Sequence, residues 1–364
     1  MDILEATADF EKWLAQQLTP DRAALELKHA HMAEAAFPFL RATFYRWVQL
    51  WPEVCPKLAG APRVLAVGDL HVENFGTWRD TEGRLTWGVN DLDEAWPGAY
   101  TLDLVRLTTS AHLAIRDEHL SLPPRKASEA IEEGYRDAMA SGGKPFVLAE
   151  HHRWLRLLAT SKLRDPVRFW ERIKALPAYK GTIPDEVRKM RESALPGFPV
   201  PYQLKKRVAG VGSLGQARVL ALASWQGAYV AREAKALRPS APVWATRGTL
   251  GELYCEALNQ SAVRVQDPFV HFRGGWLVRR LAPYCCRIEL SSLPEQRDEE
   301  KLLFSMGWET ANMHIGSRQA ITDVRRDLGA RRGRWLHKAA KAMAAATLGE
   351  WESWRRAWKR APKR

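Results

Sequence analysis

The segment Val64–Gly76, VLAVGDLHVENFG, joins an apolar run to a dense cluster of polar side chains. The apolar residues at its start are typical of a buried strand, but Asp69, His71, Glu73 and Asn74 follow within six residues. A buried ionisable or amide group is costly unless hydrogen bonds or opposite charges satisfy it. The end of this strand is therefore predicted to be a site with a chemical role.

The chain of 364 residues, with 46% hydrophobic content, is long enough to form two lobes with sizeable cores. No apolar run approaches the about 20 residues that cross a bilayer, and the acidic start MDILEATADFEKW does not resemble a secretory leader. A cytoplasmic location is therefore expected. The cysteines lack zinc-like spacing and are predicted to be buried in a reducing compartment: Cys55, Cys255, Cys285 and Cys286.

The excess positive charge is concentrated near the C-terminal end. Residues 325–364 contain thirteen Lys and Arg against three acidic residues, so they carry +10 of the formal net charge of +13. Trp351, Trp354 and Trp358 share one face of a predicted helix in this tail. Packing of that face on the body of the protein is the preferred interpretation. A surface for nucleic acid, an anionic membrane or another polyanion is the alternative.

Periodicity and turn residues divide the chain into a mostly helical part, a strand-rich part and a closing helical part. Helices are predicted at 1–50, 102–116, 127–140, 149–163, 250–265 and from 297 onwards. Strands are predicted at RVLAV, at RLTWGVN, at three places within KKRVAGVGSLGQARVLALASWQGAYVAREAKAL and, as an edge strand, at GGWLVRRL. The Pro- and Gly-rich segment 176–201 is predicted to be a linker.

The polar residues after the first two predicted strands suit phosphoryl transfer. Asn74 follows Asp69 by five residues, and Asp91 comes directly after the second strand, in VNDLDEA. A carboxylate can accept a hydroxyl proton, while an amide and a carboxylate can hold Mg²⁺ on the phosphates of a nucleotide. This pattern predicts Asp69 as a base and Asn74 and Asp91 as metal ligands. Asp93 is a further candidate, for a second metal or a water.

These motifs resemble two groups of proteins. The patterns G-D-x-H-x-x-N and N-D-x-D, followed by Asp103 in TLDLVRL, resemble the catalytic segment of the kinase-like small-molecule phosphotransferases, the aminoglycoside and choline kinase group. The five blocks FPFLRATFYRW, GDLHVENFG, NDLDEA, DPFVHF and GWETANMHIGS resemble more closely the bacterial family called domain of unknown function 2252. This second resemblance spans about residues 25 to 320.

The resemblance implies an α+β, protein-kinase-like, two-lobed fold, with a small antiparallel sheet lobe and a larger helical lobe. In ordinary kinases the glycine loop precedes the catalytic loop, whereas GVGSLG here begins at Gly210, some 140 residues after Asp69. This block order implies a circular permutation. The expected parts are 1–200 with the catalytic and metal-binding loops, 201–290 with the nucleotide-binding sheet, and 291–364 with helices that return to the helical lobe.

The glycine loop is expected to cover the phosphates of ATP, because strands rather than a helix follow it. A dinucleotide-binding turn and a structural hairpin are the alternatives for a single motif of this kind. The loop residues expected to contact the nucleotide are Gly210, Gly212, Ser213 and Gly215.

The third strand of this part is expected to bring a cation to the phosphates. The family resemblance implies Lys before Glu-Ala, but this chain has Arg232 there and Lys235 three residues later. The two side chains face opposite ways on a regular strand, so one of them can face the nucleotide. Arg232 is preferred and Lys235 is the alternative. Glu256 on the next helix is expected to pair with that cation, or else to lie on a solvated face.

Two other polar residues are expected to support the catalytic loop. The resemblance implies that Asp103 accepts hydrogen bonds from the backbone of that loop, while a helix N-cap is the alternative. His71 is expected to hydrogen-bond within the loop rather than to ligate a metal.

The favoured function is that of an ATP- and Mg²⁺-dependent phosphotransferase acting on an unidentified small-molecule or protein hydroxyl. The alternatives are a nucleotidyl transferase and an inactive kinase-like protein that binds a nucleotide or a polyanion. A metal-dependent phosphoesterase is disfavoured, because the sequence lacks the GNH and GHxH blocks of such enzymes.

Overall fold

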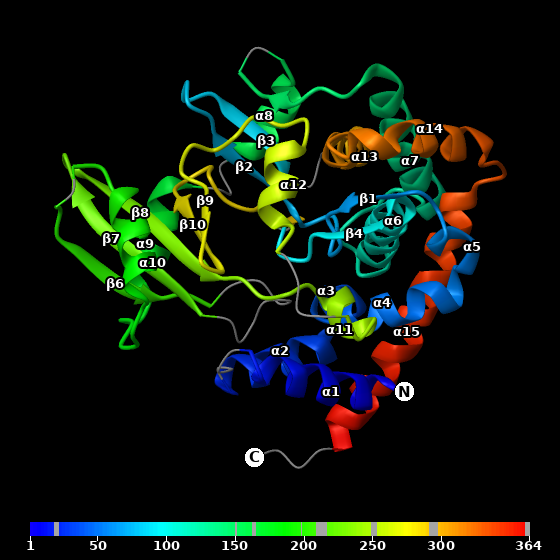
Figure 1. The fold of residues 1–364 in the computed structure, drawn as a ribbon, viewed down its shortest axis with the longest axis horizontal. Helices are drawn as coiled ribbons and strands as arrows, with labels where there is room; N and C mark the ends of the chain where they lie inside the picture. The colour runs from blue at the N-terminus through cyan, green and yellow to red at the C-terminus, as the bar shows by residue number, and fades with distance from the viewer. Residues whose placement is uncertain are drawn as a thin grey trace.

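The computed structural model describes residues 1–17, 22–149, 151–161, 165–197, 199–208, 217–248, 253–290 and 298–360. It has mixed α+β architecture, with most of the helices on one side and a five-stranded antiparallel sheet on the other (Figure 1). The sheet and the two helices packed on it are called the sheet unit below, and the remainder is called the helical body.

The helical body is built on one continuous apolar core. Its first helix begins with a capping box, in which Asp2 accepts hydrogen bonds from the backbone of Leu4 and Glu5 and the Glu5 carboxylate accepts one from Asp2. The helices are α1 (Ile3–Ala15), α2 (Arg22–Glu34), α3 (Ala36–Ala42), α4 (Phe44–Val54), α5 (Pro56–Ala59), α6 (Tyr100–Arg116), α7 (Pro124–Ser141), α8 (Arg153–Ala159), α11 (Ala241–Ala245), α12 (Cys255–Ser261), α13 (Glu299–Ile315), α14 (Ile321–Ala330) and α15 (Trp335–Arg360).

Two small antiparallel sheets lie within the helical body and carry the loops of interest. In the first, β1 (Arg63–Ala66) pairs with β4 (Trp96–Ala99). In the second, β2 (Phe75–Arg79), β3 (Leu85–Val89) and β5 (Phe146–Val147) pair in the order β2-β3-β5. RVLAV and RLTWGVN are therefore strands as predicted, but they belong to different sheets.

The sheet unit contains five antiparallel strands in the order β6-β7-β8-β10-β9. A tight turn at Gln226 and Gly227 joins β7 to β8, and both residues have the positive φ that such a hairpin turn requires. The prediction of an edge strand at GGWLVRRL is wrong, because β10 pairs with β8 on one side and β9 on the other. The strands are β6 (Tyr202–Lys206), β7 (Arg218–Trp225), β8 (Ala228–Ala236), β9 (His271–Arg273) and β10 (Trp276–Leu281).

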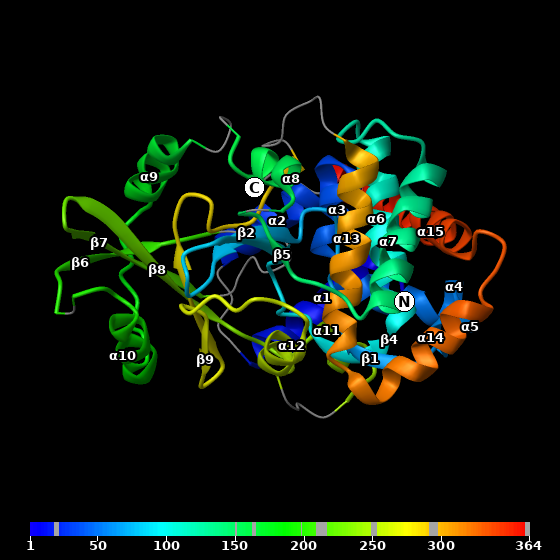
Figure 2. The ribbon, with the colours of Figure 1, turned by 90° about the horizontal axis from the view of Figure 1, so that it is seen from above.

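Two helices that precede the sheet in the chain pack on it. Ile173 of α9 (Pro166–Ala175) joins an apolar cluster with Leu220 and Leu281 of the sheet. Val187 of α10 (Asp185–Ser193) packs in a second cluster with Val278. The predicted linker at 176–201 thus contains a helix, and the sheet unit begins well before residue 201 (Figure 2).

The helix α15 closes the helical body and carries the tryptophan stripe of the basic tail. Trp351 and Trp354 are buried, and the Trp354 indole donates to the backbone oxygen of His29 on α2, whereas Trp358 is 40% exposed. Trp351 and Trp354 therefore pack on the helical body, which is the preferred of the two interpretations given above. Within the described residues, no helix combines the length and the apolar character that a membrane span requires.

The helices α7 and α13 cross where each has a glycine. A Cβ atom on Gly134 would lie 1.9 Å from the backbone oxygen of Phe304, and one on Gly307 would lie 2.1 Å from that of Ile131. Because these obstacles are backbone atoms, a methyl group would force the helices apart.

We expect Gly134→Ala and Gly307→Ala each to lower the free energy of unfolding by about 2 kcal/mol, the usual size of an overpacking penalty. Gly349→Ala on α15 is the matched control, because nothing lies within 4 Å of its Cβ position. It is expected to stabilise the protein by up to about 1 kcal/mol through helix propensity. Urea unfolding of the three variants measures both signs, and equal effects at all three positions would contradict the packing described here.

Candidate functional site

The loop that carries Asp69 leaves β1 through a turn that only glycine allows. Gly68 has φ 82°, and a Cβ there would lie 2.3 Å from the backbone oxygen of Glu94. The Leu70 amide donates to the Gly68 oxygen at 2.8 Å, which closes the turn. The GD pair of the sequence motif is thus a tight turn that sets the direction of the Asp69 side chain.

Asp69 is held by an arginine that the sequence reasoning missed. Arg106 of α6 donates from Nε (3.0 Å) and Nη2 (2.5 Å) to Asp69 Oδ1. Its guanidinium is fully buried against the rings of Phe44 and Trp47, at 4.8 and 5.1 Å from their centroids. Burial raises the pKa of Asp69, and the charge of Arg106 partly opposes that rise. Arg106 follows Asp103 by three residues, so helical spacing was the signal available in the sequence.

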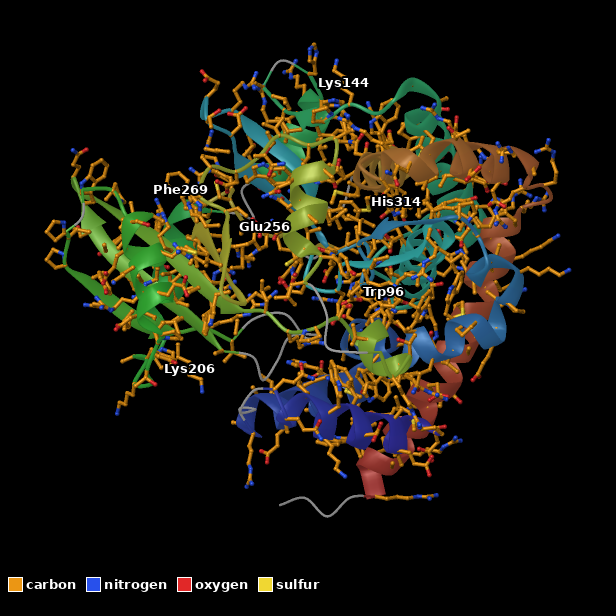
Figure 3. All side chains as sticks on the ribbon, in the orientation of Figure 1. Trp96, Lys144, Lys206, Glu256, Phe269 and His314 are labelled. Atoms are coloured by element: carbon orange, nitrogen blue, oxygen red, sulfur yellow. The ribbon has the colours of Figure 1, made fainter. Side chains whose placement is uncertain are left out.

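Asp103 anchors the backbone of the same loop from inside the helical body. It is fully buried and accepts from the amides of Val67 (2.6 Å) and Gly68 (2.9 Å). The Nε2 atom of His314, which lies near the end of α13 (Figure 3), is 2.9 Å from Asp103 Oδ2, the oxygen that also accepts from Val67. These are the backbone contacts that the family resemblance implied. The N-cap alternative does not hold, because Ala99 is the N-cap of α6 and Asp103 lies in its first turn.

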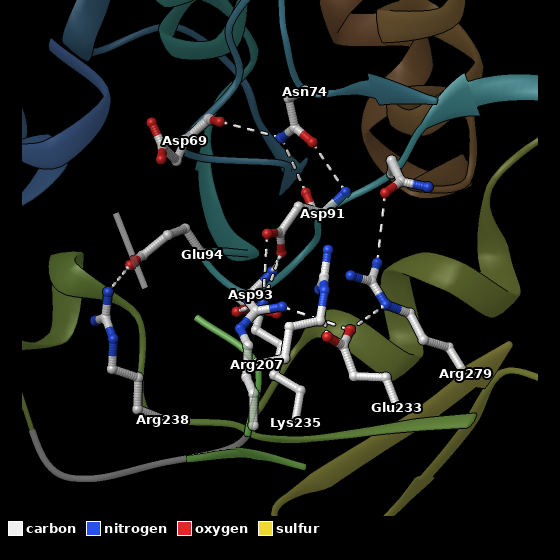
Figure 4. Close-up of polar contacts among 12 residues, drawn as sticks. Asp69, Asn74, Asp91, Asp93, Glu94, Arg207, Glu233, Lys235, Arg238 and Arg279 are labelled. Atoms are coloured by element: carbon white, nitrogen blue, oxygen red, sulfur yellow. Dashed lines mark hydrogen bonds and ion pairs between the residues drawn. The ribbon is translucent and has the colours of Figure 1, made fainter. Parts of the chain in front are cut away.

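Asn74 joins the Asp69 loop to the Asp91 loop. Its amide nitrogen donates to the backbone oxygens of Asp69 (3.1 Å) and Asp91 (2.9 Å), and its Oδ1 accepts from the Asp91 amide at 2.8 Å (Figure 4). Asn74 is buried, so these bonds fix the distance between the two loops. The Asn74 amide thus bridges the two loops. Its Oδ1 is the one atom of this amide that can also act as a metal ligand.

Lys235 of β8 lies against both candidate metal carboxylates. Its Nζ is 3.1 Å from Asp91 Oδ1 and 3.3 Å from Oδ2, and it also contacts Asp93 (Figure 4). The lysine side chain is 1% exposed, whereas that of Asp91 is 40% exposed. Lys235 therefore connects the sheet unit to the loop after β3.

Arg232 occupies the opposite face of the same strand. Its Nε donates to the backbone oxygen of Ala194 at 2.6 Å, and its guanidinium lies 4.2 Å from the ring centroid of Phe269. Arg280 stacks on the same ring at 4.7 Å, so the DPFVHF block supports a cation–π stack. The structure thus places Lys235, and not Arg232, beside the candidate metal ligands, contrary to the preference drawn from the sequence.

Both carboxylates are strongly perturbed by their surroundings. Burial alone would raise the pKa of Asp91, but the charges of Lys235, Arg218 and Arg279 outweigh it and hold that pKa well below the usual range. Burial and the charge of Asp91 raise the pKa of Asp93 to about 6. The two carboxylates behave as one coupled pair, in which Asp91 keeps the charge as pH falls.

Glu233, two residues before Lys235 on the same face of β8, gathers three arginines that the sequence reasoning also missed. Arg279 of β10 donates to it at 2.8 Å, Arg218 lies at 3.5 Å, and Arg207 is in direct contact (Figure 4). These charges hold the pKa of Glu233 well below its ordinary value, even though burial acts in the opposite direction. In the sequence, Arg207 and Arg218 stand just before and just after the glycine-loop residues 210–215.

The remaining predicted site residues are less informative or lie elsewhere. Glu256 of α12 is exposed and accepts a hydrogen bond from Gln260 at 3.1 Å, which matches the solvated alternative (Figure 3). His71 is buried, its Nδ1 accepts from the Glu73 amide at 3.2 Å, and burial lowers its pKa well below the usual range. The glycine-loop residues lie outside the described residues: Gly210, Gly212, Ser213 and Gly215.

Glu94, from the NDLDEA block, ties the segment after β8 to the same loop. Arg238 donates to it at 2.5 Å and the Ala241 amide donates at 2.6 Å. A small, partly open cavity of about 60 Å³ lies between the second small sheet, α12 and β10, and Asp93 and Arg279 are among its lining residues. In the part of the chain that the structure describes, no three His, Cys, Asp or Glu side chains gather as a metal site.

Glu309 of α13 lies beneath β3 and provides a pH-dependent prediction. It is 1% exposed and accepts from the Val89 amide at 3.2 Å and from Asn312 at 2.8 Å. Burial raises its pKa to about 7, against the opposing charge of Arg264. The folded state therefore holds a proton that the unfolded state releases near its ordinary pKa of about 4.5.

Stability is consequently expected to fall as pH rises from about 4.5 to about 7, by on the order of 3 kcal/mol from Glu309. Glu309→Gln cannot titrate, so the variant is expected to lose this share of the decline. Urea unfolding of both proteins at pH 5, 6, 7 and 8 measures the two slopes. Parallel slopes would show that Glu309 does not bind the proton.

Comparison with known proteins is informative for one part of the chain. Residues 20–168 match the family described as "Uncharacterized protein conserved in bacteria (DUF2252)". No curated protein and no solved structure matches the chain. The matched segment contains Asp69, Asn74, Asp91 and Asp103, while the sheet unit lies largely outside it. Over residues 20–168, the loops that form this site are therefore similar to those of a bacterial family, DUF2252.

Proposed function

We propose that the protein is an ATP- and Mg²⁺-dependent phosphotransferase with a circularly permuted, protein-kinase-like fold. The observation that carries the proposal is the contact of Lys235 with Asp91, on a loop that the Asn74 side chain joins to Asp69. In kinases a lysine on the third strand of the sheet reaches the phosphates, and an aspartate and an asparagine hold the metal. Lys235 lies on the third strand of the sheet unit, after the strands that flank the glycine loop.

The packing of α13 supports the permuted connection. In the kinase order, a helix leads directly into the catalytic loop. Here α13 ends at Ile315 and the backbone amide of Leu65, on β1, donates to Ser317 Oγ at 2.8 Å. His314 contacts Asp103 at the base of the Asp69 loop. The end of α13 thus adjoins the start of the catalytic segment in space, although about 250 residues separate them in the chain.

The residues divide the work of phosphoryl transfer between them. Asp69 would accept the proton of the acceptor hydroxyl, with its carboxylate oriented by Arg106. Asp91, Asp93 and Asn74 Oδ1 would hold Mg²⁺, which neutralises charge on the phosphates when bound. Lys235 and the arginines around Glu233 would position the polyphosphate. The acceptor oxygen forms the new bond to phosphorus, and the bond to the leaving diphosphate breaks.

The position of the Lys235 ammonium group shows that this site can hold a positive charge. The Lys235 ammonium stands between Asp91 and Asp93, so the two carboxylates already converge on one positive charge. Carboxylate and amide oxygens are also the donors that Mg²⁺ prefers. Both observations agree with a metal site that is completed by phosphate oxygens.

ATP labelled either on the γ- or on the α-phosphate tests the proposal. The wild-type protein, incubated with Mg²⁺ and the small-molecule and protein fractions of a bacterial lysate, is expected to transfer the γ-label. Asp69→Asn should reduce that transfer by about 100-fold or more, the usual share of a general base. Asp323→Asn, an exposed carboxylate on α14, is the control and should transfer normally. Transfer of the α-label would indicate nucleotidyl transfer, and transfer of neither label would contradict an active enzyme.

A further inference from the structure

We propose that Lys235 closes the metal site in the nucleotide-free protein and releases it when a polyphosphate takes over its ammonium group. Metal and nucleotide would then bind together and not independently. The inference rests on the proposed function for the identity of the site, but it concerns a separate property, the affinity of the free protein for a divalent cation.

The position of the ammonium group is the first observation. Lys235 Nζ lies within 3.3 Å of both oxygens of Asp91 and also contacts Asp93. A cation ligated by the same two carboxylates would have to lie in nearly the same place. Two positive charges a few ångströms apart repel each other, and water screens them poorly beside Lys235 and Asp93, whose side chains are 1% and 10% exposed. Lysine and metal are therefore alternative occupants.

The second observation is that the other carboxylate of β8 is already paired with arginines. Glu233 lies on the same face of β8 but is already in contact with Arg207, Arg218 and Arg279. Glu256, the carboxylate expected to pair with this cation, is exposed and bonded to Gln260. A polyphosphate placed between the lysine and the arginines would supply the missing negative charge.

The third observation concerns the number of metal ligands. Mg²⁺ requires about six oxygen ligands in near-octahedral geometry. Asp91, Asp93 and the Asn74 amide supply fewer than that, and the described residues contain no group of three or more His, Cys, Asp or Glu side chains suited to a metal. Phosphate oxygens would complete the coordination. The nucleotide would therefore draw Lys235 from the carboxylates and supply the remaining metal ligands. Binding of the nucleotide would in this way increase the affinity of the site for the metal.

Binding of Mn²⁺, followed by electron paramagnetic resonance at pH 8, tests the inference. Without nucleotide, Lys235→Met is expected to bind Mn²⁺ at least about 10-fold more tightly than the wild type, because the competing ammonium is gone. Lys235→Gln serves as a second neutral variant if Lys235→Met does not fold.

The control is Lys205→Met, which removes a lysine from β6 of the same sheet, where its Nζ bonds to the Lys174 oxygen at 3.0 Å. It should bind Mn²⁺ as the wild type does. Equal Mn²⁺ affinity of the wild type and both Lys235 variants would overturn the inference. Failure of the proposed function would look different: the wild type would not bind AMP-PNP with Mn²⁺, whereas the effect of removing Lys235 on free Mn²⁺ would remain.

Discussion

Asp103→Ala is expected to lower the free energy of unfolding by about 4 kcal/mol, because it leaves buried donors without an acceptor. The carboxylate is fully buried and accepts from the amides of Val67 and Gly68, and His314 contacts its Oδ2. Each unsatisfied buried donor costs about 1–3 kcal/mol. Urea unfolding monitored by tryptophan fluorescence measures the loss.

The control for Asp103→Ala is Asp323→Ala, an aspartate whose side chain is 60% exposed on α14. Its unfolding free energy should stay within about 0.5 kcal/mol of the wild type, as is usual for surface substitutions. A loss below about 1 kcal/mol for Asp103→Ala would mean that the loop backbone finds other acceptors, and that this residue does not anchor Asp69.

Asp91→Asn is expected to weaken binding of MgATP by about 100-fold, because the site loses a charged metal ligand and the partner that positions Lys235. The fold should persist, since the Asp91 side chain is 40% exposed and an Asn can keep the backbone bonds to Asn74. Calorimetric titration with MgATP measures the affinity, and circular dichroism checks the fold.

Asp185→Asn is the control for Asp91→Asn, because Asp185 is an 81% exposed aspartate in the sheet unit that pairs with Arg188. Its MgATP affinity should match that of the wild type. Equal binding by Asp91→Asn and Asp185→Asn would remove Asp91 from the site and with it the assigned role of the VNDLDEA loop.

The local part of the site was predictable because its signals are local. A strand that ends in Gly68-Asp69 forms a turn, and Asn74 lies close enough in the chain to bridge back to that turn. The alternation of a strand correctly separated Arg232 from Lys235. This alternation does not predict which face of β8 contacts the helical body, because that choice depends on packing between distant segments. Phe269, which holds Arg232 on the outer face, is 37 residues further along the chain.

Partners brought together by distant segments could not be predicted in the same way. Arg106 meets Asp69 because α6 packs beside the loop, whereas the sequence shows only that Arg106 lies one helical turn after Asp103. The three arginines of Glu233 come from separate positions along the chain, and a single sequence gives no signal that they converge. The predicted linker at 176–201 failed for a related reason, since Pro and Gly mark the ends of α10 but not its packing on the sheet.

The position of a metal in a complex tests the central claim most directly. That claim is that the Asp69, Asn74 and Asp91 loops and Lys235 form one nucleotide–metal site. Crystals of the wild type grown with AMP-PNP and Mn²⁺ should give an anomalous manganese peak bound to Asp91, with the polyphosphate against Lys235. A nucleotide bound elsewhere, or manganese without any contact to Asp91, would contradict the claim.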